Sequence, residues 1–479
     1  LSKENSNAKT NYFEIKNGVR YCMYEGFPFL YLQFSKAPQY HHQPYWYKGL
    51  EYEKEQERGY DYLEDLLVPG YFEMSIKKGE SIYVSEGLSE VSPRTLKTLW
   101  DKELSQRNAR TDMFNCLKNA ARQFAKKQKE GTYLLAGYPW FKARARDEFL
   151  SLPGCTLSIG DEDMFNEIAA SAVTEINAFI ERGKLSTLLE EIDVPSALLW
   201  FVWAVQQYAA VNKDEALNRY KKVVLGIVDF IIAQKHPNIT YRENGLLYVV
   251  GTEKPVTWMN AVEDGKPITP RTGYVVEINA LWYNALSFAA EISHPDDKKY
   301  RDILKIAQPA FIGVFWNGIY LYDYVEGFYK DVEVRPNMIY AASLPYSPLD
   351  KFQQKSVLDI CTKELLTTKG LRSLSPKSGG YRPNYVGGMK ERNRNYHNGP
   401  VWPFLTGAYC DLYLKIHKAG GISFVERLMI GMEAEMKKLC VGTLSELFDG
   451  NPPYKGHGAM SYAPTVAETL RTLKKMNSE

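Results

Sequence analysis

The sequence predicts a mainly helical protein in which helical hairpins close into a ring, preceded by a smaller region of β structure. Roughly the first 92 residues are rich in Tyr and Phe in short alternating runs, such as Tyr71-Phe-Glu-Met-Ser-Ile76, separated by Gly and Pro. From Ser92 onward, apolar residues recur at three- and four-residue spacing, as on one face of a helix. We find no repeat of fixed period, which a solenoid would show. A closed ring therefore explains the helices better than a stack of repeats.

The helical periodicity defines about a dozen segments. Several begin at a capping residue such as Asp161 and end near a glycine such as Gly183. The run Leu198-Leu-Trp-Phe-Val-Trp203 is apolar over much of a helix circumference, which predicts burial between other helices. The clearest segments are residues 112–128, 163–182, 196–211, 214–233, 275–292, 298–314, 350–366, 400–418, 422–440 and 461–475.

Two connections, residues 236–273 and 316–336, are long and rich in Gly, Pro, Tyr and charged residues. Long structured loops in a compact domain are usually functional. In a ring of helical hairpins such loops gather at one end, where we expect them to form a pocket.

Composition excludes several classes of partner. The chain has 479 residues, with Lys+Arg 59 against Asp+Glu 57 and a net charge of +2, too balanced to attract nucleic acid or an anionic membrane. The longest apolar run, Ala197 to Val205, is well short of the ~20 residues of a membrane span. The six cysteines show neither a C-x-x-C nor a zinc spacing, which fits free thiols in the cytoplasm. Because the chain begins at Leu1 rather than Met, we expect it to be part of a longer protein.

Motifs that place acidic or amide side chains beside large aromatics recur between residues 136 and 450. This combination suits a sugar, whose C–H faces stack on Trp and Tyr and whose bond is cut by two opposed carboxyl groups. The motifs are Ala136-Gly-Tyr-Pro-Trp-Phe141 with Arg146-Asp147 and Leu152-Pro-Gly154, Glu243-Asn-Gly-Leu-Leu247, Thr257-Trp-Met-Asn-Ala261, Thr269-Pro-Arg-Thr-Gly273, Val276-Glu-Ile-Asn-Ala-Leu-Trp-Tyr-Asn-Ala285, Arg335-Pro-Asn337 with Leu344-Pro345, Tyr396-His-Asn-Gly-Pro-Val-Trp-Pro403 and Leu444-Ser-Glu-Leu-Phe-Asp-Gly450.

In this order and spacing, the motifs resemble those of the amylo-α-1,6-glucosidase domain of glycogen debranching enzymes. The resemblance implies an (α/α)6 toroid over residues 93–479, with residues 1–92 as the tail of a preceding, truncated β domain. It also implies hydrolysis, with inversion, of α-1,6-linked glucose at branch points. The substrate would be glycogen, a limit dextrin or a maltooligosaccharide. No metal or organic cofactor is implied, because two carboxyl groups and water suffice.

The resemblance also assigns roles to individual residues. Glu446 matches the general base that activates the attacking water. The pair Arg146 and Asp147 matches residues that hold the hydroxyls of the terminal glucose. Each remaining match can also be a core residue, and a structural role suits His397 as readily as a binding role. The expected aromatic walls are Trp258, Trp282, Tyr396 and Trp402, and the expected polar contacts are Arg271, Glu277, Arg335, Asn337 and His397.

The chain departs from the family pattern at two positions. Asn260 stands where the family has the Asp that serves as general acid, and a neutral amide cannot protonate the departing oxygen. Ser196 stands where the family usually has Asp, which places one sugar contact in doubt. Three readings of Asn260 remain. Glu263 or Asp264 in the same loop replaces the acid, the domain binds glucan without hydrolysing it, or Asn260 is an introduced block. Another exo-glucosidase of the same ring fold is a further alternative.

Overall fold

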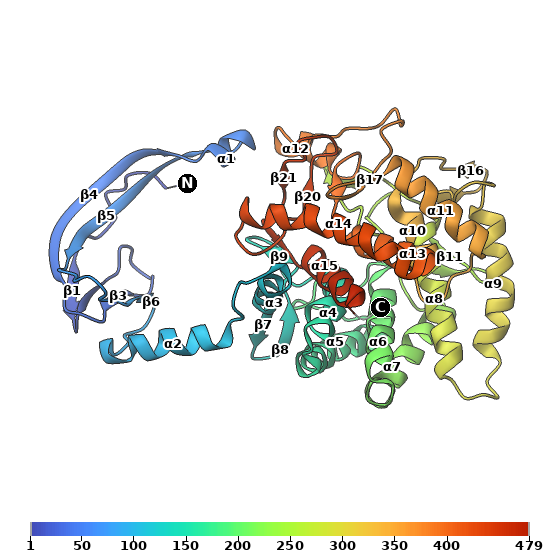
Figure 1. Ribbon diagram of the computed structural model, residues 1–479, viewed down its shortest axis with the longest axis horizontal. Coiled ribbons are helices and arrows are strands. Elements are labelled where there is room, and N and C mark those ends of the chain that lie inside the picture. The colour runs from blue at the N-terminus through green and yellow to red at the C-terminus, as the bar shows by residue number, and fades with distance from the viewer. Residues whose placement is uncertain (1, 478–479) are drawn as a thin grey trace. The chain divides into compact units, whose positions relative to one another are not determined.

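The computed structural model describes residues 2–477 and divides into two compact units (Figure 1). The first unit comprises Leu1–Asn108 with Val386–Met389, and the second comprises Ala109–Tyr385 with Lys390–Glu479. The first unit extends beyond the expected boundary at residue 92, because it includes the helix α2 (Leu96–Gln106).

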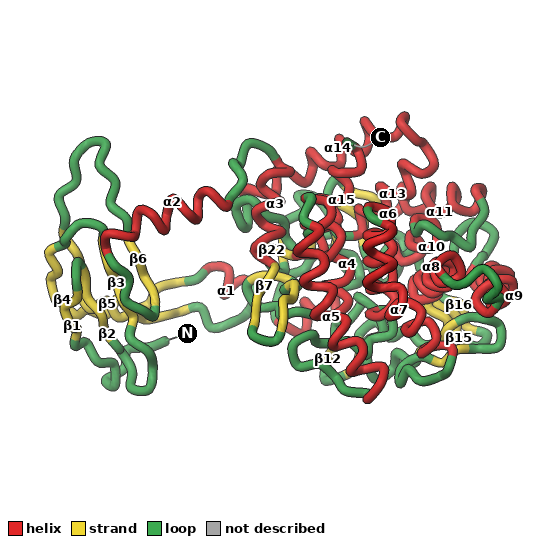
Figure 2. Tube along the Cα trace, turned by 90° about the horizontal axis from the view of Figure 1, so that it is seen from below, coloured by secondary structure: helices red, strands yellow, loops and turns green. Residues whose placement is uncertain are grey.

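The first unit consists mainly of β structure, as its alternating pattern predicts. Four short strands form an antiparallel sheet in the order β1-β2-β3-β6, and two longer strands, β4 and β5, pair separately. Figure 2 shows how strands dominate this unit and helices the other. The elements are β1 (Tyr12–Ile15), β2 (Gly18–Tyr21), β3 (Leu30–Phe34), β4 (Gln39–Glu51), α1 (Glu53–Glu57), β5 (Leu63–Glu73) and β6 (Val84–Gly87).

The second unit is an (α/α)6 toroid with six inner and six outer helices. Each inner helix contacts the next in the order α4, α6, α8, α10, α13 and α15, and the ring closes where α15 packs on α4. The inner helices are α4 (Ala145–Cys155), α6 (Ala197–Val211), α8 (Val276–Ile292), α10 (Ile339–Ser343), α13 (Leu405–His417) and α15 (Ala463–Met476). The outer helices are α3 (Met113–Phe124), α5 (Glu162–Arg182), α7 (Lys213–Ile232), α9 (Lys299–Phe315), α11 (Lys351–Glu364) and α14 (Ile422–Glu433).

More than half of the residues of every inner helix are buried. All residues of α4 are buried, as are most of those of α6 and α8. Closure of the ring requires a close approach at Gly154, where an added Cβ would lie 2.1 Å from the carbonyl oxygen of Ala467. Within residues 2–477, no helix is long and apolar enough to cross a membrane.

Small antiparallel sheets cover one end of the toroid. The two long loops supply a five-stranded sheet in the order β10-β11-β14-β15-β16, and β14 leads directly into α8. A second five-stranded sheet, β17-β18-β19-β20-β21, pairs Val401 with Phe448. The first sheet comprises Thr240–Tyr241, Leu247–Val249, Gly273–Val275, Tyr324–Glu326 and Tyr329–Lys330. The second comprises Leu366–Thr367, Gly370–Arg372, Val401–Trp402, Leu447–Phe448 and Gly456–His457.

Shorter pairings complete the unit. The hairpin β12–β13 follows Asn260, and the short helix α12 precedes Tyr396. These elements are β7 (Ala125–Gln128) with β8 (Gly131–Leu134), β9 (Gly137–Tyr138) with β22 (Ser461–Tyr462), β12 (Val262–Glu263) with β13 (Lys266–Pro267), and α12 (Met389–Asn395).

Candidate active site

All six inner helices direct their N-terminal ends to one place. The side chains there surround a cavity of about 10 Å³, which holds about one water. Entry of a ligand larger than water therefore requires lining side chains to move. The residues at the helix starts are Arg146 and Asp147 of α4, Ser196 before α6, Glu277 of α8, Asn337 before α10, Phe404 before α13 and Tyr462 before α15. The cavity is lined by Arg146, Asp147, Leu150, Ser196, Trp200, Thr257, Trp258, Glu277, Tyr340, Phe404 and Tyr462.

Two polar atoms at this cavity are buried without a hydrogen-bond partner in the described chain, Asp147 Oδ2 and Ser196 Oγ. The other carboxylate oxygen of Asp147 accepts from Arg146 Nε at 3.0 Å, while Arg146 Nη1 donates to the carbonyl of Thr257 at 2.9 Å. Because burying an unpaired polar group is costly, these two oxygens favour a ligand with hydroxyl groups. Ser196 thus reaches the cavity although it departs from the family pattern.

Strand pairing brings the segment that carries Glu446 beside Tyr396, although neither Glu446 nor Asn260 is among the residues that line the cavity. Because β19 pairs with β20, the turn that begins at Tyr396 lies beside Glu446. Glu446 Oε2 accepts from the backbone N–H of Ala459 at 2.7 Å, and Oε1 accepts from the Tyr396 hydroxyl. Burial raises the pKa of Glu446 to about 7, and both hydrogen bonds oppose this shift. Only glycine fits at position 458, where a Cβ would lie 2.3 Å from Glu446 Oε2.

Asn260 is held by the residue that follows Tyr396. The backbone N–H of Asn260 donates to His397 Nε2 at 3.0 Å. Burial keeps the pKa of His397 well below its usual value, so the ring is neutral and accepts at Nε2. Tyr396 therefore holds Glu446, and the next residue, His397, holds the backbone of Asn260. The family resemblance implies the general base at position 446 and the general acid at position 260.

Two tryptophan rings pack against the rings of Tyr396 and His397. The ring of His397 stacks on Trp402 with centroids 5.1 Å apart, and Trp258 meets Trp402 edge-on at 5.1 Å. Tyr396 also contacts Trp402, at 4.9 Å. Three of the four predicted aromatic walls are thus brought together. Trp282 is not among them: it is fully buried, donates to the carbonyl of Gly245 at 3.0 Å and belongs to the core.

Several predicted polar contacts instead form a buried network behind Trp258. Trp258 Nε1 donates to Asn337 Oδ1 at 2.7 Å, and Asn337 Nδ2 donates to Asp323 Oδ1 at 2.7 Å. Arg271 lies between two carboxylates, with Nε 2.7 Å from Asp323 Oδ2 and Nη2 2.7 Å from Glu277 Oε2. This network positions Trp258, and of its charged members only Glu277 also lines the cavity.

Arg335, another predicted contact, is also buried. Its Nη1 donates to the carbonyl of His397 at 2.8 Å, and its Nη2 donates to Asn398 Oδ1 at 3.1 Å. Arg335 therefore holds the backbone of the turn that carries Tyr396 and His397.

The two loop carboxylates considered as replacement acids lie in the β12–β13 hairpin. Arg394 of α12 donates to both oxygens of Glu263, at 2.6 and 2.8 Å. Lys390 Nζ donates to Asp264 Oδ1 at 3.0 Å. The hydrogen bonds from Arg394 lower the pKa of Glu263, whereas a general acid needs a raised pKa. This pairing favours a structural role for Glu263.

Sequence reasoning missed six residues that line the cavity. The sequence shows where a helix begins, but it does not show whether that helix belongs to the inner or the outer layer of the ring. Residues at the starts of inner helices could therefore not be recognised as lining residues. No group of three or more potential metal ligands is present within residues 2–477. The six missed residues are Leu150, Trp200, Thr257, Tyr340, Phe404 and Tyr462.

Comparisons with known proteins agree with this architecture. A curated relative, the glycogen debranching enzyme of Saccharomyces cerevisiae, is 23% identical over 391 residues, which covers 59% of this chain and 25% of the yeast protein. The chain thus spans about a quarter of that relative's length. A solved structure of an uncharacterized conserved protein from Thermus thermophilus has a TM-score of 0.51 at 13% identity, covering 74% of this chain and 99% of that one. A glycosidase in complex with glucose also has a TM-score of 0.51 at 13% identity, covering 77% and 99%.

Sequence families match both units. Residues 1–83 match the family described as glycogen debranching enzyme N terminal. Residues 116–471, which are most of the chain, match the family described as Amylo-alpha-1,6-glucosidase. The chain therefore belongs to the amylo-alpha-1,6-glucosidase family of glycoside hydrolases.

Proposed function

We propose that this chain acts on α-1,6-linked glucose at the branch points of glycogen or a related α-glucan. The observation that carries the proposal is the dipeptide Tyr396-His397, which holds Glu446 by one side chain and the backbone of Asn260 by the other. The terminal glucose would enter among the inner-helix N-termini, where Asp147 Oδ2 and Ser196 Oγ lack partners within the described chain.

Glu446 is the general base in this proposal. Its carboxylate takes a proton from the water that attacks the anomeric carbon, and the product has the inverted, β configuration. The departing oxygen also needs a proton, which Asn260 cannot supply. We therefore propose slow hydrolysis. The absence of an acid at residue 260 favours a second candidate, a glucan-binding protein that retains the pocket without turnover.

A glucose assay on a branched limit dextrin tests the proposal. We expect slow release of β-glucose by the unaltered chain and none by Glu446→Gln, which cannot accept the proton. Glu426→Gln is the matched control, because Glu426 is an exposed carboxylate on α14. No release from the unaltered chain, with maltotriose binding retained, would support the binding protein instead. Equal release by Glu446→Gln and the unaltered chain would overturn the role of Glu446.

Activity should depend on pH through Glu446. A base must be ionised, and the pKa of Glu446 is raised to about 7 by burial. We expect kcat/KM to fall about tenfold per pH unit below pH 7, as measured from glucose release. The contribution of Glu446 to the stability of the fold should instead be larger at low pH than at high pH. The protonated carboxyl stabilises the fold fully below the unfolded value of about 4.5, and this contribution is lost as the pH rises through 7. Glu446→Gln, which stays neutral, should therefore melt higher than the unaltered chain at pH 8 but not at pH 4.5.

The hairpin that follows Asn260 should affect binding through its ion pair with α12. Arg394→Glu is expected to weaken maltotriose binding by at most about fivefold, since ion pairs at the surface contribute little. Combining it with Glu263→Arg should restore the affinity, as measured by calorimetric titration. The control is the same exchange at the Lys355–Asp359 pair on α11, where Nζ and Oδ1 are 2.7 Å apart. A reversed pair that binds no better than Arg394→Glu would contradict this positioning role.

A further inference from the structure

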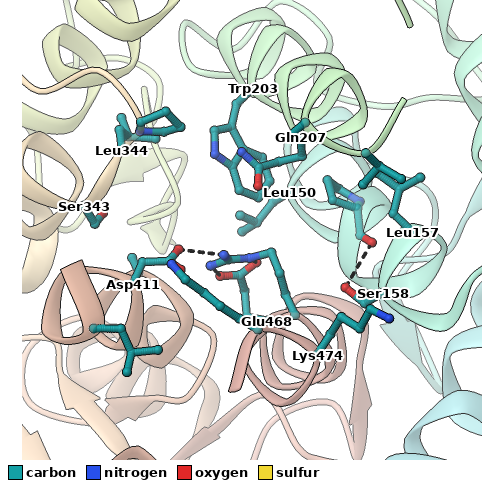
Figure 3. A pocket seen from close by; sticks show the side chains of 18 of the residues that line it. Leu150, Leu157, Ser158, Trp203, Gln207, Ser343, Leu344, Asp411, Glu468 and Lys474 are labelled. Atoms are coloured by element: carbon teal, nitrogen blue, oxygen red, sulfur yellow. Dashed lines mark hydrogen bonds and ion pairs between the residues drawn. The ribbon is translucent and has the colours of Figure 1, made fainter. Parts of the chain in front are cut away.

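A second and much larger cavity lies at the opposite end of the toroid, where the inner helices end (Figure 3). Its volume is about 790 Å³, within the range of about 300–1,000 Å³ typical of small-molecule sites. Its lining includes Gln207 near the end of α6, Ser343 at the end of α10, Lys415 near the end of α13 and Lys475 near the end of α15. It is therefore formed by different helix ends from those at the candidate active site.

Most charged groups of this second cavity are already paired within the protein. Arg471 lies 2.6 Å from Asp411 Oδ2 and 2.6 Å from Glu468 Oε2, and Lys475 Nζ lies 2.9 Å from Asp411 Oδ1. Lys415 Nζ donates to the carbonyl of Ala342 at 3.0 Å, at the end of α10. Arg471 and Lys475 are thus neutralised by carboxylates, whereas Lys415 is held by a neutral carbonyl, and Lys418 and Lys474 also line the cavity. The helix C-termini at this end oppose the binding of an anion.

Neutral polar groups remain available. The side chains of Gln207, Ser343 and Tyr340 line the cavity and make no side-chain hydrogen bond within residues 2–477. Tyr340 is 4% exposed, and its hydroxyl has no protein partner in the described chain. Trp203 lies one helical turn before Gln207 on the same face of α6, and the two side chains lie side by side in Figure 3. Uncharged hydrogen-bonding groups beside an aromatic wall suit a ligand with many hydroxyl groups and no net charge.

Only one layer of side chains separates the two cavities. Leu150, Trp200 and Tyr340 line both, and the rings of Trp200 and Tyr340 meet at 5.2 Å. We propose that the second cavity is a non-catalytic binding site for a neutral sugar, either glucose or a short α-glucan oligosaccharide. The identity of the sugar as a glucan rests on the proposed function, whereas the preference for a neutral polyhydroxylated ligand rests on the cavity alone.

Calorimetric titration of Glu446→Gln with maltotriose tests the proposal, because this variant binds without turnover. We expect two sites per chain. Adding Gln207→Leu or Ser343→Ala should weaken one site by about 2- to 13-fold, the effect of one lost hydrogen bond, and leave the other unchanged. Adding Trp258→Ala should instead weaken the site at the inner-helix N-termini and leave the second cavity's site unchanged. Gln128→Leu, at an exposed position on β7, is the matched control and should change neither site.

A single maltotriose site that is lost in Trp258→Ala and unaffected by Gln207→Leu and Ser343→Ala would overturn the proposal. So would binding of inorganic phosphate that is weakened by Gln207→Leu while maltotriose binding is not. Failure of the proposed function has a different signature. Glucose release would then be the same in Glu446→Gln and the unaltered chain, whatever the titrations show at Gln207.

Discussion

Asn260→Asp is expected to raise glucose release from a branched α-glucan by about 10²–10⁴-fold, the usual contribution of a general acid. The backbone of residue 260 is already held by His397 beside the Tyr396–Glu446 hydrogen bond, so the substitution restores a carboxyl without moving the chain. Release of β-glucose from a limit dextrin measures the effect. Affinity for maltotriose should barely change.

Asn260→Ser is the control, since it alters the same side chain without providing a proton. Its activity should not exceed that of the unaltered chain. If the unaltered chain is already fast and loses its activity in Glu263→Gln or Asp264→Asn, the proton comes from the hairpin and the role proposed for residue 260 is wrong. If Asn260→Asp does not raise glucose release, and Glu263→Gln and Asp264→Asn do not lower it, the pocket is a binding site.

Arg271→Met is expected to destabilise the toroid by about 3–5 kcal/mol, the usual cost of breaking a buried ion pair from one side. Arg271 is 2% exposed and neutralises both Glu277 and Asp323, which would be left as buried carboxylates without their cation. A large fall in melting temperature, followed by circular dichroism at about 222 nm, where helices absorb, measures the effect.

Arg219→Met is the matched control. Arg219 is exposed and pairs with Glu215 one turn earlier on α7, so its loss should barely change the melting temperature. Adding Glu277→Gln and Asp323→Asn removes the two carboxylates that Arg271→Met leaves without a cation. These additions should recover much of the stability lost in Arg271→Met. Equal melting temperatures for Arg271→Met and Arg219→Met would contradict the buried network.

Periodicity alone predicted most of the toroid. Ten helices fall on the ten expected segments, and the two that periodicity missed, α4 and α10, are both inner helices. In α4, Pro153 and Gly154 interrupt any helical pattern, and every face is buried, so no polar stripe marks the helix. The helix α10 is only five residues long, too short to show a period.

The sequence predicted a candidate site as a set of motifs, but it could not predict which of their side chains lie next to one another. Resemblance selected Trp258 and Trp282 equally, yet only Trp258 lies beside Trp402. Both indoles sit in apolar, motif-rich segments, and which one faces the cavity depends on how the helices turn in the ring. The same limit applies to Arg335, whose partners are two backbone carbonyls and the Asn398 side chain, which no sequence pattern specifies.

A nascent chain cannot complete the toroid until its last helix has left the ribosome, because the ring closes only where α15 packs on α4. About 300 residues of sequence separate these two helices, so their pairing is a slow, long-range folding step. Tyr462 joins the cavity only with that step. Until then, the apolar faces of the inner helices are open to chaperones and to aggregation. We expect ligand binding to appear late and all at once during synthesis.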